Sequence, residues 1–171
     1  VKEFEDAFKD YKGIQYSTAL NSCTAALHLS LMALDLKKGD EVITTPMTFC
    51  ATVNTIIHAG LKPVLVDVDP FSMNIDPMKI EEKITKKTKC ILPVHFSGRS
   101  CEMNEIVKIA KNNNLYIVED CAHAIETEYH GKKAGTFGDF GCFSFYVTKN
   151  LVTGEGGMVI TNHKANANRI K

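Results

Sequence analysis

The stretch EVITTPMTFCATVNTIIHAGLKPVLVDV, residues 41–68, decides the class of fold. Residues 41–45 have the pattern of a short strand, and residues 48–59 have helical spacing that ends at Gly60. Residues 63–68 follow as a second strand, rich in valine. Strands that alternate with helices in this way are typical of a parallel sheet whose faces are covered by helices.

The same alternation continues on both sides of this stretch. Further helices are expected at residues 4–11, 24–34, 77–84 and 102–113, and further strands at residues 90–95 and 115–118. Glycines then punctuate the pattern, which predicts a hairpin at residues 129–134, strands at 141–145 and 157–161, and a final helical segment at 164–171. The prediction is a single α/β domain, in which a mostly parallel sheet has helices on both faces as an α/β/α sandwich.

The composition is that of an ordinary globular protein, with 44% hydrophobic and 23% charged residues. The 20 Lys and Arg residues balance the 20 Asp and Glu residues, so no net field attracts nucleic acid or an anionic membrane. No apolar run approaches the roughly 20 residues that span a bilayer, and residues 1–11 do not resemble a signal peptide. We therefore expect a cytoplasmic protein that binds neither nucleic acid nor membrane.

The cysteines are scattered and form no C-x-x-C pair. Each has apolar or small neighbours, which favours buried free thiols over a metal site or a disulfide framework. No metal is expected. The six residues are Cys23, Cys50, Cys90, Cys101, Cys121 and Cys142.

Ligands of open parallel sheets bind at the carboxyl ends of the strands, and four candidate positions lie just past predicted strands. The first is NSCTAA, residues 21–26, whose small residues at a helix N-terminus allow backbone N–H groups to approach a phosphate. The same residues also cap helices that bind nothing. The second is Phe49, at the start of a predicted helix, where its ring stacks on a flat cofactor or packs in the core.

The third position is Asp120, which lies three residues before His123. A buried carboxylate needs a cationic or hydrogen-bonding partner, and a pyridinium nitrogen is such a partner, although a cap or a turn is the alternative. The fourth is FSFYVTKN, residues 143–150, followed by GEGG at residues 154–157. Its lysine, Lys149, is either a solvated loop residue or is held near a buried ligand as a nucleophile toward aldehydes.

Taken in order, the phosphate loop, the aromatic residue, the strand-end Asp and the Ser and Lys resemble the fold-type I pyridoxal-phosphate (PLP) enzymes. The motifs are similar to those of the DegT/DnrJ/EryC1/StrS sugar aminotransferases over nearly the whole chain. They are NSCTAAL at 21–27, PVLVDVD at 63–69, PVH at 93–95, EDCAHA at 119–124, FSF at 143–145, and KN at 149–150 with GEGG at 154–157. The resemblance implies the PLP-dependent transferase-like large domain of the aspartate aminotransferase superfamily.

Carried over residue by residue, the resemblance implies that Lys149 forms a Schiff base with the aldehyde of PLP and that Asp120 pairs with the ring nitrogen. Phe49 would lie on the ring face, and His123 occupies the position where the family has Gln or His near the ring. The phosphate would be held by Thr24, by the backbone around Cys23 and by the hydroxyl of Ser144. Glu155 lies in the GEGG turn beside the lysine. The implied catalytic residues are Lys149, Asp120 and His123.

The resemblance also implies a reaction. An amino group would move from glutamate or glutamine to a keto group on a nucleotide-linked sugar, for polysaccharide or antibiotic-sugar synthesis, and the complete enzyme would be a homodimer. Two features depart from the family pattern. Cys23 stands where many members have glycine, which would narrow the phosphate site if the backbone there needs a positive φ. Residues 1–171 also lack the family's small C-terminal domain, so we expect an incomplete large domain that binds PLP weakly and does not turn over as an isolated monomer.

Two alternatives remain open. A PLP-dependent sugar dehydratase is the first, but dehydrating relatives carry histidine at the position of Lys149, which favours amino transfer here. A non-catalytic, cofactor-binding fragment is the second, since the same residues permit cofactor binding without turnover.

Overall fold

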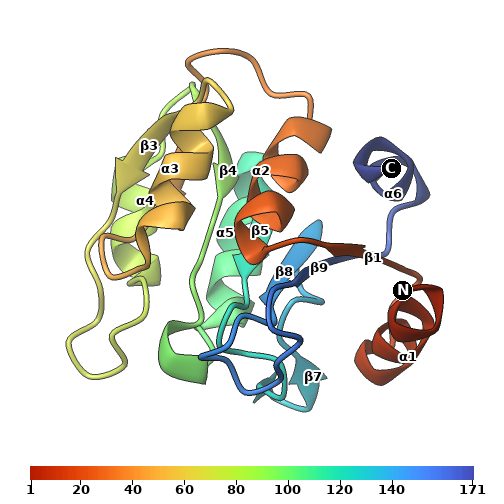
Figure 1. Cartoon of the computed structure of the whole chain (residues 1–171). Coiled ribbons are helices and arrows are strands. Elements are labelled where there is room, and N and C mark those ends of the chain that lie inside the picture. Colours follow the sequence, from red (N-terminus) through yellow and green to blue (C-terminus); the bar gives the residue numbers. More distant parts are fainter.

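A seven-stranded sheet runs through the molecule (Figure 1). The computed structural model describes all residues, Val1–Lys171. In spatial order the strands are β1 Tyr16–Leu20, β9 Gly157–Thr161, β8 Phe140–Ser144, β5 Tyr116–Asp120, β4 Thr88–Ile91, β2 Glu41–Thr44 and β3 Lys62–Leu65. The strands from β3 to β8 pair in parallel, and β9 is antiparallel to both of its neighbours. The predicted α/β fold with a mostly parallel sheet is confirmed.

Six helices and a small hairpin complete the chain. The helices are α1 Lys2–Lys12, α2 Cys23–Ala33, α3 Cys50–His58, α4 Pro77–Lys83, α5 Met103–Asn113 and α6 Lys164–Ile170, with a 3-10 turn η1 at Phe96–Gly98. The predicted hairpin pairs β6 Glu128–Tyr129 with β7 Lys132–Lys133. None of the helices has the length and apolarity to span a lipid bilayer.

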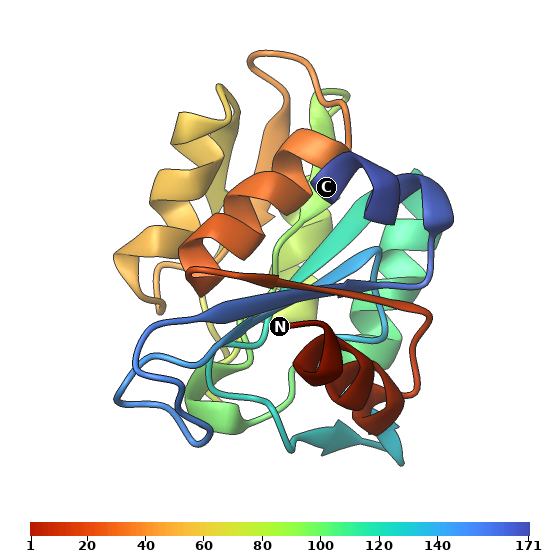
Figure 2. The same cartoon turned by 45° about the vertical axis from the view of Figure 1, so that its right-hand side comes forward.

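The strands divide their side chains between two helical layers, because successive residues of a strand point to opposite faces. Helices α2, α3 and α6 pack on one face, against strand residues that include Val42, Cys90, Val118, Cys142 and Val159. Helices α4 and α5 pack on the other face against Ile43, Ile91 and Ile117, and α1 packs there against Phe143 and Ile160. In Figure 2, β1 and β9 cross the view with α2 and α6 above them and α1 below. The result is the expected three-layer sandwich.

Several strands end at other residues than the sequence pattern predicted, and the strand expected over residues 63–68 ends at Leu65. The strand expected over residues 90–95 leaves the regular ladder after Ile91, near Pro93, a residue that has no N–H to donate. The strand expected to end at Val118 continues to Asp120, whose N–H donates to the Pro93 carbonyl. Asp120 is therefore held by the sheet itself rather than by a loop beyond it.

The cysteines are all free thiols, as predicted, but one is not buried. Cys50 is exposed as the first residue of α3, where the helix begins at the molecular surface. The expectation that every cysteine is buried is wrong for this residue. The other five are buried.

Lys12, at the end of α1, is a buried lysine that is 4% exposed. Its ammonium group donates to the carbonyl oxygens of Ile125 at 2.7 Å and Ala134 at 2.9 Å, and lies 4.4 Å from the centre of the Phe143 ring. Burial lowers the pKa of Lys12 to about 8. The helix is thereby tied to the segment that follows β5.

A lysine whose pKa is lower in the folded than in the unfolded chain makes stability rise with pH between the two pKa values. We therefore expect the free energy of unfolding of the wild type to rise relative to Lys12→Met between about pH 8 and pH 10.5. The relative gain should reach about 3 kcal/mol, since each pKa unit is worth about 1.4 kcal/mol. Urea unfolding of both proteins at several pH values measures it. A constant difference across this range would contradict the prediction.

Candidate functional site

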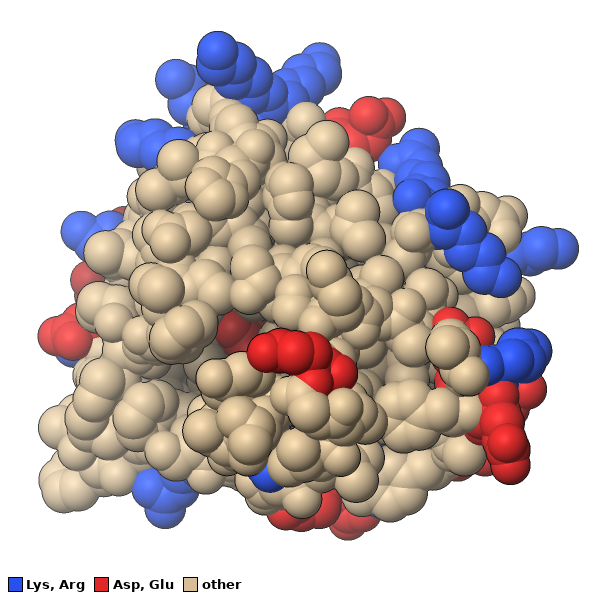
Figure 3. Space-filling view, in the orientation of Figure 1, with Lys and Arg blue, Asp and Glu red and all other residues tan.

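A cavity of about 430 Å³ opens at the carboxyl ends of the parallel strands. Figure 3 shows a hollow on this face, with acidic atoms inside it and beside it. The residues that were predicted from the sequence come together here, although they lie far apart along the chain. Cys23, Thr24, Phe49, Asp120, His123, Ser144, Lys149 and Glu155 all line the cavity. Their roles toward a cofactor stay predictions.

One wall of the cavity is the N-terminus of α2. The Ser22 hydroxyl caps the helix by accepting from the N–H of Ala25 at 3.1 Å, and the Ser22 carbonyl accepts from Ala26. Cys23 and Thr24 are the first residues of α2, so their N–H groups have no acceptor within the helix and point toward the cavity end, where an anion can bind.

Cys23, which stands where the resemblance leads us to expect glycine in many members, does not disturb this wall. Cys23 is the first helical residue of α2 and its φ is not positive. The phosphate site is therefore not narrowed by a strained backbone at this residue. Glycine is instead required at Gly157, because a Cβ at this residue would lie 2.3 Å from the carbonyl carbon of Ser22. The glycine-rich turn and the helix N-terminus therefore meet backbone to backbone.

Asp120 lies at the floor and is 4% exposed. Its carboxylate accepts from the Thr52 hydroxyl at 2.9 Å and from the N–H of Ala122 at 3.1 Å, and Thr48 contacts Thr52 at 2.6 Å. Burial raises the pKa of Asp120 above its usual value, and these hydrogen bonds offset part of the effect. A buried carboxylate that lacks a cation is poised to bind one.

Lys149 and His123 face each other across the cavity, with 2.7 Å between Nζ and Nε2. Burial and the positive charge of Lys149 lower the pKa of His123, so the imidazole is neutral near pH 7. A neutral Nε2 accepts a hydrogen bond from the lysine, which has no carboxylate within ion-pairing distance.

Phe49 and Ser144 complete the predicted set. Phe49 precedes α3 as its N-cap and is 76% exposed at the cavity, so its ring is available to cover a flat ligand. Ser144 ends β8, and its hydroxyl accepts weakly from the N–H of Tyr146 at 3.4 Å. The hydroxyl therefore keeps most of its capacity for a ligand.

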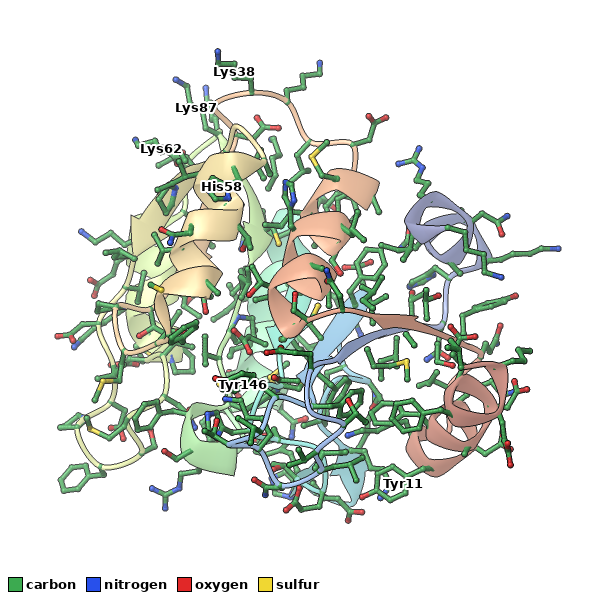
Figure 4. All side chains as sticks on the ribbon, in the orientation of Figure 1. Tyr11, Lys38, His58, Lys62, Lys87 and Tyr146 are labelled. Atoms are coloured by element: carbon green, nitrogen blue, oxygen red, sulfur yellow. The ribbon has the colours of Figure 1, made fainter.

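Several lining residues were given no role by the sequence analysis, although Tyr146 and Thr148 lie within the candidate stretch 143–150. Thr48 and Thr52 were inside a predicted helix, and their spacing of four residues was the signal that both lie on one face of it. Tyr146, labelled in Figure 4, and Thr148 lie in the loop between β8 and Lys149. Together the set offers free N–H groups, hydroxyls, a buried carboxylate, an exposed ring and a lysine. These groups fit a flat ring that carries a phosphate, a cationic nitrogen and an aldehyde.

Comparison with known proteins agrees with this geometry. Residues 1–171 match the model of the DegT/DnrJ/EryC1/StrS aminotransferase family. The spore coat polysaccharide biosynthesis protein SpsC of Bacillus subtilis is 49% identical over 171 residues, which are 100% of this chain and 44% of SpsC. GDP-perosamine synthase of Escherichia coli O157:H7 is 46% identical over 96% of this chain and 45% of its own length. The chain thus spans less than half the length of these relatives.

Solved structures show the same fold. The aminotransferase from Psychrobacter cryohalolentis superposes with a TM-score of 0.97 and 40% identity, over 99% of this chain and 43% of that one. The GDP-4-keto-6-deoxy-D-mannose-3-dehydratase of Escherichia coli, solved with bound hydrated PLP, superposes with a TM-score of 0.93 and 31% identity, over 97% and 44% of the two chains.

Proposed function

The chain belongs to the DegT/DnrJ/EryC1/StrS aminotransferase family, and from this premise we propose that it binds PLP and transfers an amino group, with Lys149 as the residue that carries the cofactor. The observation that carries the proposal is the convergence of Lys149, His123 and Asp120 in one cavity beside the free N–H groups of α2. A solved structural neighbour with bound PLP, at 31% identity, supports the choice of cofactor.

PLP, when bound, supplies an aldehyde for amines and a ring that takes up an electron pair. The chain's residues supply position and charge. Asp120 would place a negative charge against a ring nitrogen, and an anionic partner keeps a cationic nitrogen protonated. The N–H groups of Cys23 and Thr24 and the hydroxyl of Ser144 would bind the phosphate, and Phe49 would cover the ring face. Once the amino donor has displaced Lys149 from the cofactor, its Nζ would take up a proton as base and return it as acid, and His123 would accept a hydrogen bond from Nζ.

We propose a nucleotide-linked keto sugar as the acceptor and glutamate or glutamine as the donor. The names of two relatives, GDP-perosamine synthase and a spore coat polysaccharide protein, support a sugar substrate. We also propose that the complete enzyme is a homodimer. Exposed apolar side chains close to Lys149 support association, since such patches are typical of interfaces. They include Phe49, Tyr146, Val147, Leu151 and Val152.

A sugar dehydratase is the second candidate, because a dehydratase superposes on the chain with a TM-score of 0.93. Lys149 favours amino transfer, since dehydrating relatives are expected to have histidine at this position. Incubation with a 4-keto sugar nucleotide and 15N-glutamate separates the two reactions. An aminated sugar supports transfer, whereas a deoxygenated sugar without 15N supports dehydration.

The lysine itself can be identified chemically. Borohydride reduction in the presence of PLP, followed by peptide mass spectrometry, should place the pyridoxyl group on Lys149. The reason is its position, in a cavity beside an anion site and without an ion pair. Lys149→Arg is the control and should remove the label. A label on Lys89 or Lys132 instead would show that the assignment is wrong.

A further inference from the structure

Glu119 precedes Asp120 on β5, but its side chain lies on the opposite face of the sheet from the cavity. It is completely buried. One carboxylate oxygen accepts from the N–H groups of Phe137 at 2.7 Å and Gly138 at 2.8 Å, and the other accepts from Gly135 at 2.8 Å. A single side chain therefore holds the whole loop before β8.

The fourth partner of this carboxylate is His95, whose Nε2 lies 3.1 Å from Glu119. The other ring nitrogen, Nδ1, accepts from the N–H of Cys101 at 3.1 Å, so it carries no proton. The proton of the neutral ring is therefore on Nε2, which donates to Glu119. His95 is 1% exposed and both of its nitrogens are used.

This network is connected to Asp120 through the main chain. The N–H of His95 donates to the Asp120 carbonyl at 3.1 Å, and the N–H of Asp120 donates to Pro93 at 2.9 Å. His95 thus binds Glu119 with its ring and Asp120 with its backbone. The loop 135–138 is also packed tightly against β5, because a Cβ on Gly138 would lie 2.5 Å from the carbonyl oxygen of Ile117.

Ligand atoms of His95, Glu119 and Cys121 lie within 4.8 Å of one another, which is also the arrangement of a metal site. Glu119, however, already accepts four hydrogen bonds, and both nitrogens of His95 are engaged. The cluster is a closed hydrogen-bond network, and its function has to be sought in what it holds in place.

We propose that Glu119 is a positioning residue, which fixes the place of the Asp120 carboxylate through His95 and through the loop 135–138. The inference rests on the proposed function, since it concerns the site of Asp120 for the cofactor ring. A displacement of a reacting group by about 1 Å costs about 10²-fold in rate. Glu119 would thus affect the reaction from the far face of the sheet.

Glu119→Gln tests this, because an amide has one accepting oxygen and one NH₂ group. The NH₂ group of the glutamine would face N–H donors from which the carboxylate accepted hydrogen bonds. These hydrogen bonds cannot form again. Glu41→Gln is the matched control. Glu41 is also buried, at 5% exposed, and accepts from Thr85 and Lys62, but it lies at the amino end of β2. Its partner Lys62 lies at the upper end in Figure 4, and Tyr146 of the cavity lies in the lower half.

Both variants are compared with the wild type in the complete, PLP-loaded enzyme, at a temperature where circular dichroism shows all three folded. The readouts are the visible absorption spectrum of bound PLP, its dissociation constant, and kcat and KM for the amino donor. We expect Glu119→Gln to change the spectrum and to lower kcat about 10²-fold with little change in KM. Glu41→Gln should match the wild type. Equal behaviour of the two variants would overturn the proposal.

A second pair covers the case in which Glu119→Gln does not fold. His95→Gln keeps one donor for Glu119 and one acceptor for Cys101, whereas His95→Leu has neither. We expect kcat of His95→Gln to stay within about threefold of the wild type, with an unchanged spectrum. We expect kcat of His95→Leu to fall about 10²-fold, with a changed spectrum. Equal effects of both would overturn the inference. Failure of the wild type itself to bind PLP would instead contradict the proposed function and, with it, this inference.

Discussion

In the complete enzyme, Lys149→Ala will reduce amino transfer by about 10⁴-fold, the upper end of the range for an acid–base group. The lysine is the only amine that lines the cavity, and alanine leaves no group there to take the proton. The initial rate of transfer from 15N-glutamate measures the loss. Lys132→Ala, in the exposed hairpin β6–β7, should keep the wild-type rate.

Lys149→Arg separates charge from chemistry at the same position. A guanidinium group keeps the positive charge and can still donate to His123, but it does not give up a proton at neutral pH. We therefore expect Lys149→Arg to be as inactive as Lys149→Ala. If Arg restored more than about a tenth of the wild-type rate, Lys149 would act by its charge alone and the proposed acid–base role would be wrong.

In the complete enzyme, Asp120→Asn will slow transfer by about 10²- to 10³-fold, the range for loss of one preorganised electrostatic contact. The amide has the shape of the carboxylate but no negative charge, so it cannot keep a ring nitrogen protonated. Binding of PLP should be largely retained, because the residues that we propose for the phosphate lie on α2 and β8 rather than on β5. Stopped-flow absorbance after addition of the amino donor measures the rate. A rate close to that of the wild type would make Asp120 a structural residue.

The same substitution will stabilise the protein in the absence of cofactor at pH 7. Burial raises the pKa of Asp120, so the folded chain binds a proton that the unfolded chain has released. The wild type therefore loses stability as pH rises above the ordinary value of 3.8, until the buried carboxyl has ionised. Asparagine does not ionise, so it loses no stability in this way. Its side-chain oxygen can accept from the N–H of Ala122, and its NH₂ group can donate to the hydroxyl of Thr52.

Urea unfolding of the two cofactor-free proteins between pH 4 and pH 7 tests the sign. The advantage of Asp120→Asn should grow with pH and vanish near the bottom of the range, at about 1.4 kcal/mol for each unit by which the pKa is raised. An advantage that is independent of pH would mean that ionisation of Asp120 is not its cause. A gain in stability with a loss of activity is the expected signature of a charge that is kept for function.

The order of the elements and the places of the candidate residues could be read from the sequence, because both depend on local properties. The alternation of valine-rich runs with helical spacing decided the layers. The resemblance then singled out Asp120, His123 and Lys149 by their motifs. Periodicity and turn chemistry depend on only a few neighbouring residues, so both can be recognised from the sequence alone.

What binds these residues to one another was decided only by the tertiary structure. The contact between His123 and Lys149 joins residues 26 apart, and the bond from Thr52 to Asp120 joins residues 68 apart. The bonds of Glu119 to residues 135–138 likewise depend on how β5 and β8 pair. Strand order, the reversed direction of β9 and these contacts follow from which apolar faces pack together, and no local pattern contains that information. The sequence by itself therefore determined which chemical groups the protein has, and the register of the sheet decided which of them meet.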